Sequence, residues 1–258
     1  MRSVKVDLST ELKSVELHTF GDWHIGDEFC DMATIKAEIE QVRTTPNAYC
    51  ILNGDLCNTA LKTSVSDIYS EKMSIMEQIN TCLSLLQPIK DKILFITTGN
   101  HESRAYKTDG IDIMQLIAKQ LGLEDRYRSE GGVLFLRFGK VNTHQHSRKQ
   151  VYAIYITHGT GGGKKAGAKA NRLEDLACIV DADIYLHAHT HLPLIFKQCY
   201  YRVSWGNSST ALVEKLFVNT SAMLNYGGYG QTAGFKPASK SNPVVYLNGS
   251  KREMRARL

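Results

Sequence analysis

The sequence lacks a long apolar run. Over its 258 residues, no stretch approaches the roughly 18 consecutive apolar residues that a membrane-spanning helix needs. Residues 1–12 alternate charged and apolar side chains, so they contain no uninterrupted segment of signal-peptide length. These absences predict a soluble, cytoplasmic protein with no membrane partner.

Cysteine is present, but without the spacing of a structural site. The six cysteines are scattered irregularly, and no pair has zinc-ribbon spacing. A chain of this length can build a sufficient core without disulfides, so we expect no disulfide framework. We interpret Cys57 as a small residue packed beneath a loop rather than as a redox group.

Internal repeats, low-complexity tracts and an interdomain linker are also missing, which favours a single domain over residues 1–258. The hydrophobic content of 43% is ordinary for a soluble globular protein. The net charge of +5 is compatible with a polyanionic substrate but too small to establish one.

Periodic segments that alternate along the chain indicate an α/β fold. Apolar residues at helical spacing predict helices over residues 32–42, 69–86 and 113–121, which end before Pro46, before Pro88 and at Gly122. Asn171 and Glu174 have the form of a capping box that starts another helix. Strands are expected at residues 194–196, 201–205, 215–218 and 244–247.

Five short clusters of polar residues follow apolar, β-rich runs that end at residues 20, 52, 97, 156 and 186. In α/β sheets, ligands bind beyond the carboxyl ends of the strands, so the five clusters can face one cleft. Carboxylate, amide and imidazole ligands suit Mn²⁺, Zn²⁺, Fe or Ni²⁺, whereas a structural zinc site would recruit thiolates. The clusters are Asp22-Trp23-His24-Ile25-Gly26, Gly54-Asp55-Leu56-Cys57-Asn58, Gly99-Asn100-His101-Glu102, Thr157-His158-Gly159 and His187-Ala188-His189-Thr190-His191.

In this order, the clusters resemble the motifs of the calcineurin-like metallophosphoesterase family: Asp-x-His, Gly-Asp-x-x-Asp/Asn, Gly-Asn-His-Asp/Glu, a lone His and Gly-His-x-His. One departure is Ala188, which stands where the family usually has glycine and removes no ligand. The resemblance implies a four-layer α-β-β-α sandwich, with two packed mixed β-sheets flanked by helices. Residues 52–71 and 167–191 are most similar to the small phosphoesterases of phages and prophages.

The resemblance also implies a binuclear metal centre. Mn²⁺ is favoured for both ions, with Zn²⁺, Fe or Ni²⁺ as alternatives. His101 is implied as the catalytic group that protonates the leaving oxygen or stabilises the phosphoryl group. We interpret His187 as a strand end or a supporting residue and do not count it as a ligand. The implied ligands are Asp22, His24 and His191 for the first ion, Asn100, His158 and His189 for the second, and Asp55 as the bridge.

This ligand set implies hydrolysis of a phosphate ester by a metal-bound hydroxide, without a covalent intermediate. We favour a phosphodiesterase or nuclease acting on nucleotides or nucleic acid. A phosphomonoesterase acting on a protein or a small molecule is the alternative. A non-catalytic scaffold is a third hypothesis, but it should have lost several ligands, and this sequence retains them.

Two loops and one arginine are candidates for binding the substrate. Lys164 and Lys165 follow the glycines of residues 159–163, whose backbone amides can approach a phosphate closely; a solvated loop is an equal alternative. Tyr226 lies on a glycine-rich stretch, residues 219–242, where it can stack on a base, although we favour packing over the sheet edge. Arg104 can reach a phosphate from the rim of the cleft.

Overall fold

Two mixed β-sheets form the centre of the computed structural model, which describes residues 1–62, 64, 68–142 and 147–258. Part of the stretch 52–71, which carried the similarity to phage phosphoesterases, therefore lies outside the described residues. The six-stranded sheet has the order β1 (Ser3–Asp7), β5 (Gly132–Asn142), β6 (Ser147–Ile156), β7 (Ile184–His187), β9 (Ser209–Asn219) and β8 (Leu194–Ser204). The five-stranded sheet has the order β11 (Met254–Arg257), β10 (Val244–Asn248), β2 (Ser14–Phe20), β3 (Ala48–Asn53) and β4 (Ile93–Thr97).

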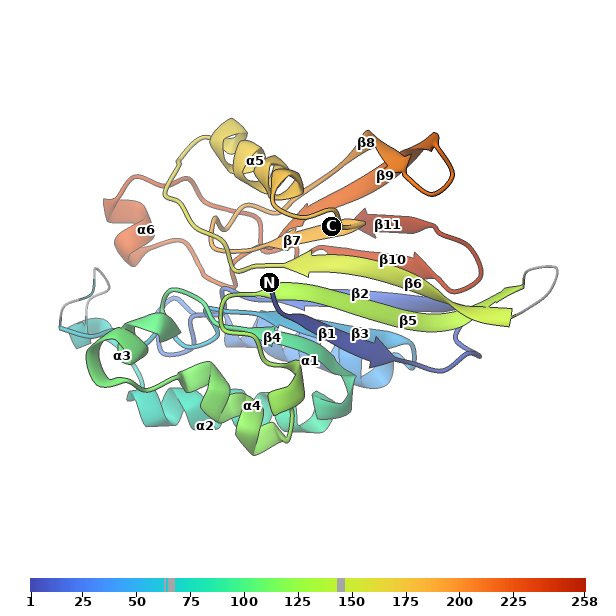
Figure 1. The fold of residues 1–258 in the computed structure, drawn as a ribbon. Helices are drawn as coiled ribbons and strands as arrows, with labels where there is room; N and C mark the ends of the chain where they lie inside the picture. The colour runs from blue at the N-terminus through green and yellow to red at the C-terminus, as the bar shows by residue number, and fades with distance from the viewer. Residues whose placement is uncertain (63, 65–67, 143–146) are drawn as a thin grey trace.

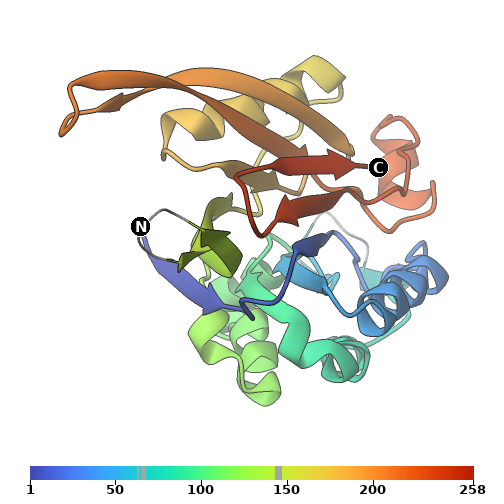
Figure 2. The same cartoon turned by 90° about the vertical axis from the view of Figure 1, so that its right-hand side faces the viewer.

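Helices lie on the outer sides of the two sheets (Figures 1 and 2). In Figure 2, α5 lies above the six-stranded sheet, while α1, α2 and α4 lie below the five-stranded sheet. This arrangement confirms the predicted α-β-β-α sandwich. The helices are α1 (Met32–Thr44), α2 (Ile75–Leu86), α3 (Glu102–Asp109), α4 (Ile113–Leu121), α5 (Ala166–Asp175) and the short α6 (Gly228–Thr232). Single 3₁₀ segments span Ile68–Ser70, Gln87–Lys92, Glu124–Arg126 and Leu176–Cys178.

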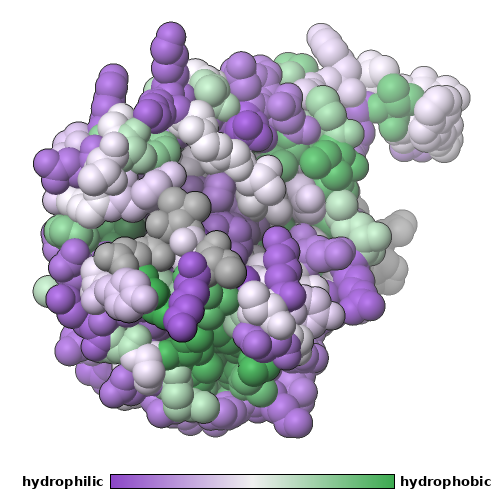
Figure 3. All heavy atoms as spheres, turned by 90° about the vertical axis from the view of Figure 1, so that its left-hand side faces the viewer, coloured by the Kyte–Doolittle hydropathy of each residue, from purple (hydrophilic) through white to green (hydrophobic). Residues whose placement is uncertain are grey.

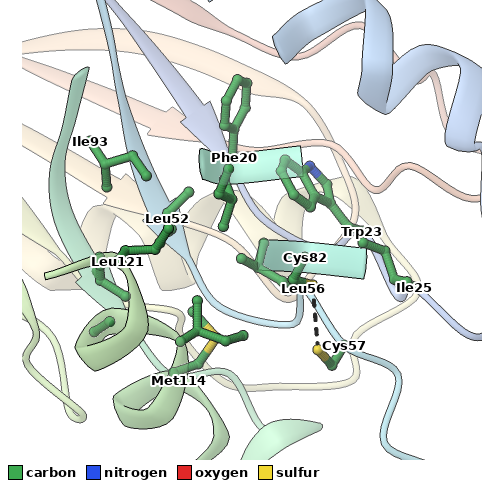
Figure 4. Packing of buried hydrophobic residues seen from close by; sticks show 14 of the residues in the cluster. Phe20, Trp23, Ile25, Leu52, Leu56, Cys57, Cys82, Ile93, Met114 and Leu121 are labelled. Atoms are coloured by element: carbon green, nitrogen blue, oxygen red, sulfur yellow. Dashed lines mark hydrogen bonds between the residues drawn. The ribbon is translucent and has the colours of Figure 1, made fainter. Parts of the chain in front are cut away.

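Three apolar clusters hold the layers together. Leu17 of β2 and Leu136 of β5 belong to the cluster between the two sheets. Phe20 points to the other side of β2, where it joins the cluster between the five-stranded sheet and the helices α1, α2 and α4 (Figure 4). Alternation along the strand explains the division, because successive side chains point to opposite faces of a sheet. A third cluster, which includes Leu173, lies under α5.

The helix predictions are confirmed for α1 and α4 and need correction elsewhere. Gly122 ends α4 in the left-handed conformation, with φ at 73°. The second predicted helix begins later than expected, at Ile75, where Ser74 and Glu77 form a reciprocal capping box. The capping box predicted at Asn171 is wrong, because α5 begins at Ala166 and Asn171 lies within it.

The strand predictions are correct in place but not in extent. Residues 194–196 and 201–205 were expected as separate strands, but they belong to the single strand β8, which ends at Ser204. Continuous antiparallel pairing with β9, from Leu194 opposite Asn219 to Ser204 opposite Ser209, carries the backbone through the polar middle of β8. Within the described residues, no helix combines the length and the apolar character required to cross a bilayer.

Candidate metal centre

The five polar clusters all follow the carboxyl ends of strands. In one sheet, β2, β3 and β4 are parallel; in the other, β6 and β7 are parallel. Parallel strands deliver the residues that follow them to the same edge of a sheet. The arrowheads of β6 and β7 mark this edge at the left of Figure 1. Figure 3 shows the same end of the molecule, with hydrophilic side chains in a recess near its centre.

The backbone at these clusters is held in a conformation that L-residues rarely adopt. Among the described non-glycine residues, seven have positive φ, and five of them belong to the predicted ligand set. These five are Asp22 (φ 50°), His24 (50°), Asp55 (53°), His189 (62°) and His191 (54°). Such a conformation costs on the order of 1–3 kcal/mol per residue, and it persists where the surrounding structure enforces it.

Buried neighbours enforce this conformation. Trp23 and Ile25, which flank His24, are fully buried in the cluster beneath α1, α2 and α4 (Figure 4). Leu56 and Cys57, which follow Asp55, are buried in the same cluster. Within each motif, apolar residues therefore anchor the chain in the core while the polar residues point to the cleft. The expectation that Cys57 packs beneath the loop is confirmed.

The structure brings most of the predicted ligand atoms together. Asp22, His24 and His191 form one group whose ligand atoms lie within 4.8 Å of one another, and Asp55, His158 and His189 form another. Asp55 also groups with His24 and His101 under the same limit, so it lies between the first two groups. The amide oxygen of Asn100 lies 3.1 Å from His158 Nε2, on the side of the second group.

Several of these nitrogen and oxygen atoms face one another without enough hydrogens to form hydrogen bonds. A cation bound between them would take up their lone pairs. His24 Nε2 and His191 Nε2 lie 3.2 Å apart, although two neutral imidazoles can share only one hydrogen there. Asp22 Oδ1 is buried without a hydrogen-bond donor among the described residues. Carboxylate, amide and imidazole donors converging in this way fit divalent metal ions.

Hydrogen bonds from outside the groups fix the orientation of the candidate ligands. His158 Nδ1 donates to the carbonyl oxygen of Asn53 at 2.7 Å, which directs Nε2 at the cleft, where the neutral imidazole would offer its lone pair to a cation. Asp22 Oδ2 accepts from the backbone N–H of His189 at 2.9 Å. Such supporting contacts orient ligands in metal sites generally.

Comparison with known proteins agrees with this geometry. A sequence model described as calcineurin-like phosphoesterase matches residues 18–193, which is more than half of the chain and contains all five clusters. The chain belongs to the calcineurin-like phosphoesterase family. Membership implies a phosphoester hydrolase that uses divalent metal ions. No curated protein matches the chain.

The solved structures that match the chain include three of low sequence identity. A predicted phosphoesterase from Streptococcus pneumoniae is 14% identical, with a TM-score of 0.38 over 95% of this chain and 90% of that chain. Vps29 from Entamoeba histolytica, solved with Zn²⁺, is 12% identical, with a TM-score of 0.42 over 94% and 97%. A metallophosphoesterase from Sphaerobacter thermophilus is also 12% identical, with a TM-score of 0.38 over 93% and 90%.

Glu102 is a site residue to which the sequence motif assigned no role. Its buried carboxylate accepts three backbone N–H groups, from Asp55, Cys57 and Gly99, each at 3.0 Å. These contacts join the loop after β3 to the loop after β4. The residue was visible as the last member of Gly99-Asn100-His101-Glu102, but its contacts could not be inferred from spacing.

Small residues allow the loops to approach closely. A Cβ atom on Gly99 would lie 2.0 Å from Asp55 Oδ1, and one on Gly159 would lie 2.0 Å from His187 Nε2. Ala188, by contrast, is fully buried and does not have positive φ, so alanine fits without backbone strain where the family usually has glycine. His187 ends β7 and lies 2.7 Å from Asn219 Oδ1, as expected of a strand end or supporting residue.

The charges in the cleft are strongly coupled. Burial alone would raise the pKa of Asp55, but the imidazoles of His158 and His101 hold it well below its usual value. Burial would lower the pKa of His158, but Asp55 raises it to about 10. Burial, together with His158, lowers the pKa of His189 to about 4. A cation bound to His158 requires the neutral imidazole, so cation binding would release a proton.

His101 is held in one tautomer by its two neighbours. Its Nδ1 lies 2.8 Å from the carbonyl oxygen of Asn58, which can only accept. Its Nε2 lies 3.2 Å from Arg104 Nη2, which can only donate. The hydrogen therefore resides on Nδ1. Burial is the main reason that the pKa of His101 is lowered, and the nearby Arg104 guanidinium adds to the effect.

The predicted substrate residues lie in two places. Arg104 contacts His101 and thus belongs to the cleft. Lys164 and Tyr226 instead meet around Phe235: the ammonium group lies 5.7 Å from the ring centroid, and the tyrosine hydroxyl donates to the Phe235 carbonyl at 3.0 Å. We expected Tyr226 to pack over the sheet edge, but its hydroxyl group instead contacts a residue of its own loop. Lys165 is exposed and precedes α5.

Proposed function

We propose that this protein is a binuclear metal-dependent phosphoesterase that hydrolyses phosphodiester bonds in nucleotides or nucleic acid. The observation that carries the proposal is the position of Asp55. Its carboxylate lies within 4.8 Å of ligand atoms from both imidazole groups, which is the place of a bridging ligand. Asp22, His24 and His191 would hold one ion, and Asn100, His158 and His189 would hold the other.

The ions themselves would be divalent. The oxygens of Asp22, Asp55 and Asn100 together with the imidazoles suit Mn²⁺, which we favour, and the same set would accept Zn²⁺, Fe or Ni²⁺. When bound, such ions supply a nucleophile from water near neutral pH and offset the charge of the phosphoryl oxygens. The ionised state of Asp22 and Asp55 prepares the cleft for cations, because the neighbouring imidazoles lower the pKa of each carboxyl despite its burial.

Proton transfer would fall to His101. In its resting tautomer, Nε2 carries no hydrogen and faces the Arg104 guanidinium. A bound phosphate ester brings negative charge, which raises the pKa of a neighbouring imidazole and draws Arg104 toward the phosphate. His101 would then be protonated at Nε2 and could donate that proton to the leaving oxygen. Arg104 would hold a phosphoryl oxygen at the same time.

The loops next to the cleft support a nucleotide-containing substrate. Lys164 of the glycine-rich loop lies over the Phe235 ring, and the ring of Tyr229 lies 6.2 Å from the same ring. Lys169 ties the helix after this loop to the metal motif, since its ammonium group donates to the Thr190 carbonyl at 2.6 Å. A cation close to aromatic rings, of which that of Tyr229 is exposed, can contact both phosphate and base.

Hydrolysis of two small esters tests the reaction class. We expect the Mn²⁺-loaded protein to cleave bis-para-nitrophenyl phosphate, a diester, with a higher kcat/KM than para-nitrophenyl phosphate, a monoester. The His101→Ala variant serves as the control for contaminating activity. A clear preference for the monoester would replace the proposal with a phosphomonoesterase, and activity on neither ester would contradict hydrolysis altogether.

A further inference from the structure

A second concentration of charge lies on the outer face of the six-stranded sheet. Val6 and Leu136 point into the core between the sheets, so the residues next to them on β1 and β5 point outward. These outward side chains are Lys5, Asp7, Phe135 and Arg137. In the described part of the chain, α5 packs against β7 and β9, and Figure 1 shows no helix in front of β1, β5 and the first half of β6. This part of the sheet face is open.

The open face contains a hollow of about 540 Å³, lined by Asp7, Arg137, Arg148, Lys149 and Val151. Arg137 binds both oxygens of Asp7, with Nε 2.9 Å from Oδ1, and Lys149 Nζ donates to Oδ1 at 3.1 Å. Asp7 therefore orients two cations while it neutralises one. Arg148 also lines the hollow, which thus holds three positive groups and one carboxylate, an excess of two positive charges.

Apolar surface lies directly beside these cations. Phe135 is 39% exposed and pairs across the strands with Lys5 on one side and Ala153 on the other. Val151, next to Arg137 on the adjacent strand, is also 39% exposed. An exposed aromatic ring among cations on an open sheet suits a ligand that presents both unstacked bases and phosphates. A duplex hides its bases within the stack, and an acidic peptide offers no bases.

We propose that this face of β1, β5 and β6 binds single-stranded nucleic acid. Arg137, Arg148 and Lys149 hold the phosphates, and Phe135 stacks on a base. The proposal rests on the proposed function and narrows its substrate class. β6 runs from this face toward His158, nine residues beyond Lys149, which is about 30 Å at the rise of a strand. A ligand that occupies both places must be a polymer rather than a free nucleotide.

The test compares two pairs of charge substitutions in the metal-loaded protein. The first variant is Arg137→Gln with Lys149→Gln. The control is Lys251→Gln with Arg255→Gln, since these exposed cations also share one carboxylate, that of Glu253, on the other sheet. Binding is read by fluorescence anisotropy with a single-stranded, phosphorothioate-linked oligonucleotide of about 20 nucleotides, long enough for a typical single-strand site.

We expect the first variant to lose at least tenfold in affinity, with the slope of log K against log salt smaller by about 1.4 for two lost phosphate contacts. The control should stay within about twofold of wild type. Phe135→Ala, which removes a half-exposed ring and no charge, should lose about tenfold, as for one stacked base. All three should hydrolyse bis-para-nitrophenyl phosphate at the wild-type rate.

Three results would overturn the inference: equal affinities for the two charge variants, tighter binding of duplex than of single-stranded DNA, or equal binding of polyglutamate. Failure of the proposed function would look different. If wild type binds the oligonucleotide through Arg137 and Lys149 but hydrolyses no ester, the binding site stands and the reaction does not. If it hydrolyses the diester while the first variant binds as wild type does, the reaction stands and the site does not.

Discussion

Asp55 is in contact with several residues of the candidate metal centre. Its Oδ1 accepts the backbone N–H of His101 at 2.8 Å, and its Oδ2 lies 3.2 Å from His158 Nε2. Its own backbone N–H is bound by Glu102. The two carboxylate oxygens and the backbone of Asp55 are thus each held by a different residue.

Replacing Asp55 by asparagine should reduce bound metal from two ions per chain to one or none. The amide keeps the shape of the carboxylate but not the charge that offsets two cations. Metal content after dialysis, measured by atomic emission, checks this prediction. Asp112→Asn, which makes the same chemical change at the start of α4, should retain both ions. Full metal content in Asp55→Asn would show that Asp55 is not the bridge.

Replacing His101 by alanine should separate chemistry from metal binding. Its ring nitrogens bind Asn58 and Arg104, so neither of these two hydrogen bonds supports one of the seven predicted ligand side chains. We expect both ions to remain and kcat on bis-para-nitrophenyl phosphate to fall about 10²–10⁴-fold, the usual reach of general acid catalysis. An unchanged kcat would remove His101 from the mechanism, and lost metal would make it a ligand.

The candidate ligands could be predicted from the sequence because each lies within a few residues of a strand end. Asp22 and His24 alternate with the buried Trp23 and Ile25, and that local pattern carries the geometry. Glu102 could not be interpreted in this way. Two of its three partners are backbone N–H groups of one loop, 47 and 45 residues earlier in the chain, and backbone groups leave no mark in a sequence.

At the scale of elements, two segments with the sequence pattern of a capping box differ in structure. Ser74 and Glu77 form a capping box, and Ser74 has the extended backbone of a residue that precedes a helix. Asn171 and Glu174 have the same spacing, but the chain is already helical from Ala166 onward. Leu173 of α5 is buried in the apolar cluster between this helix and the six-stranded sheet, and contacts with β7 and β9 place the helix. Tertiary packing therefore decides whether a segment with this pattern caps a helix.

The two segments should respond differently to alanine. Ser74→Ala removes a side-chain acceptor for the N–H of Glu77 at the start of α2, so the free energy of unfolding should fall by about 1 kcal/mol. Asn171→Ala places a better helix former inside α5 and should leave stability unchanged or slightly raised. Urea denaturation of both variants measures the difference. Equal destabilisation would mean that Asn171 caps a helix after all.

At the scale of the whole molecule, the layered core contains groups whose titration sets stability. His18 lies on β2 next to Phe20, is 3% exposed, and has an Nε2 without a partner in the described structure. Burial, assisted by Lys92, lowers the pKa of His18 to about 4. Glu38, which accepts from Asn242, titrates in the opposite sense, since burial raises its pKa to about 7.

These shifts predict opposing pH dependences of the free energy of unfolding. Below pH 6.5 the unfolded chain protonates His18 while the folded protein does not, so stability falls as the pH drops from 6.5 toward 4, by up to about 3 kcal/mol. The folded protein keeps Glu38 protonated between pH 4.5 and 7, so the stability that Glu38 contributes is lost as the pH rises through this range.

The variant His18→Gln should remove only the loss of stability at low pH. Urea denaturation measures the free energy of unfolding of both proteins, with a chelator present to avoid proton release from cation binding. As the pH falls, the variant should lose less stability than wild type. A constant difference between the two proteins would mean that the pKa of His18 is the same in the folded and the unfolded chain.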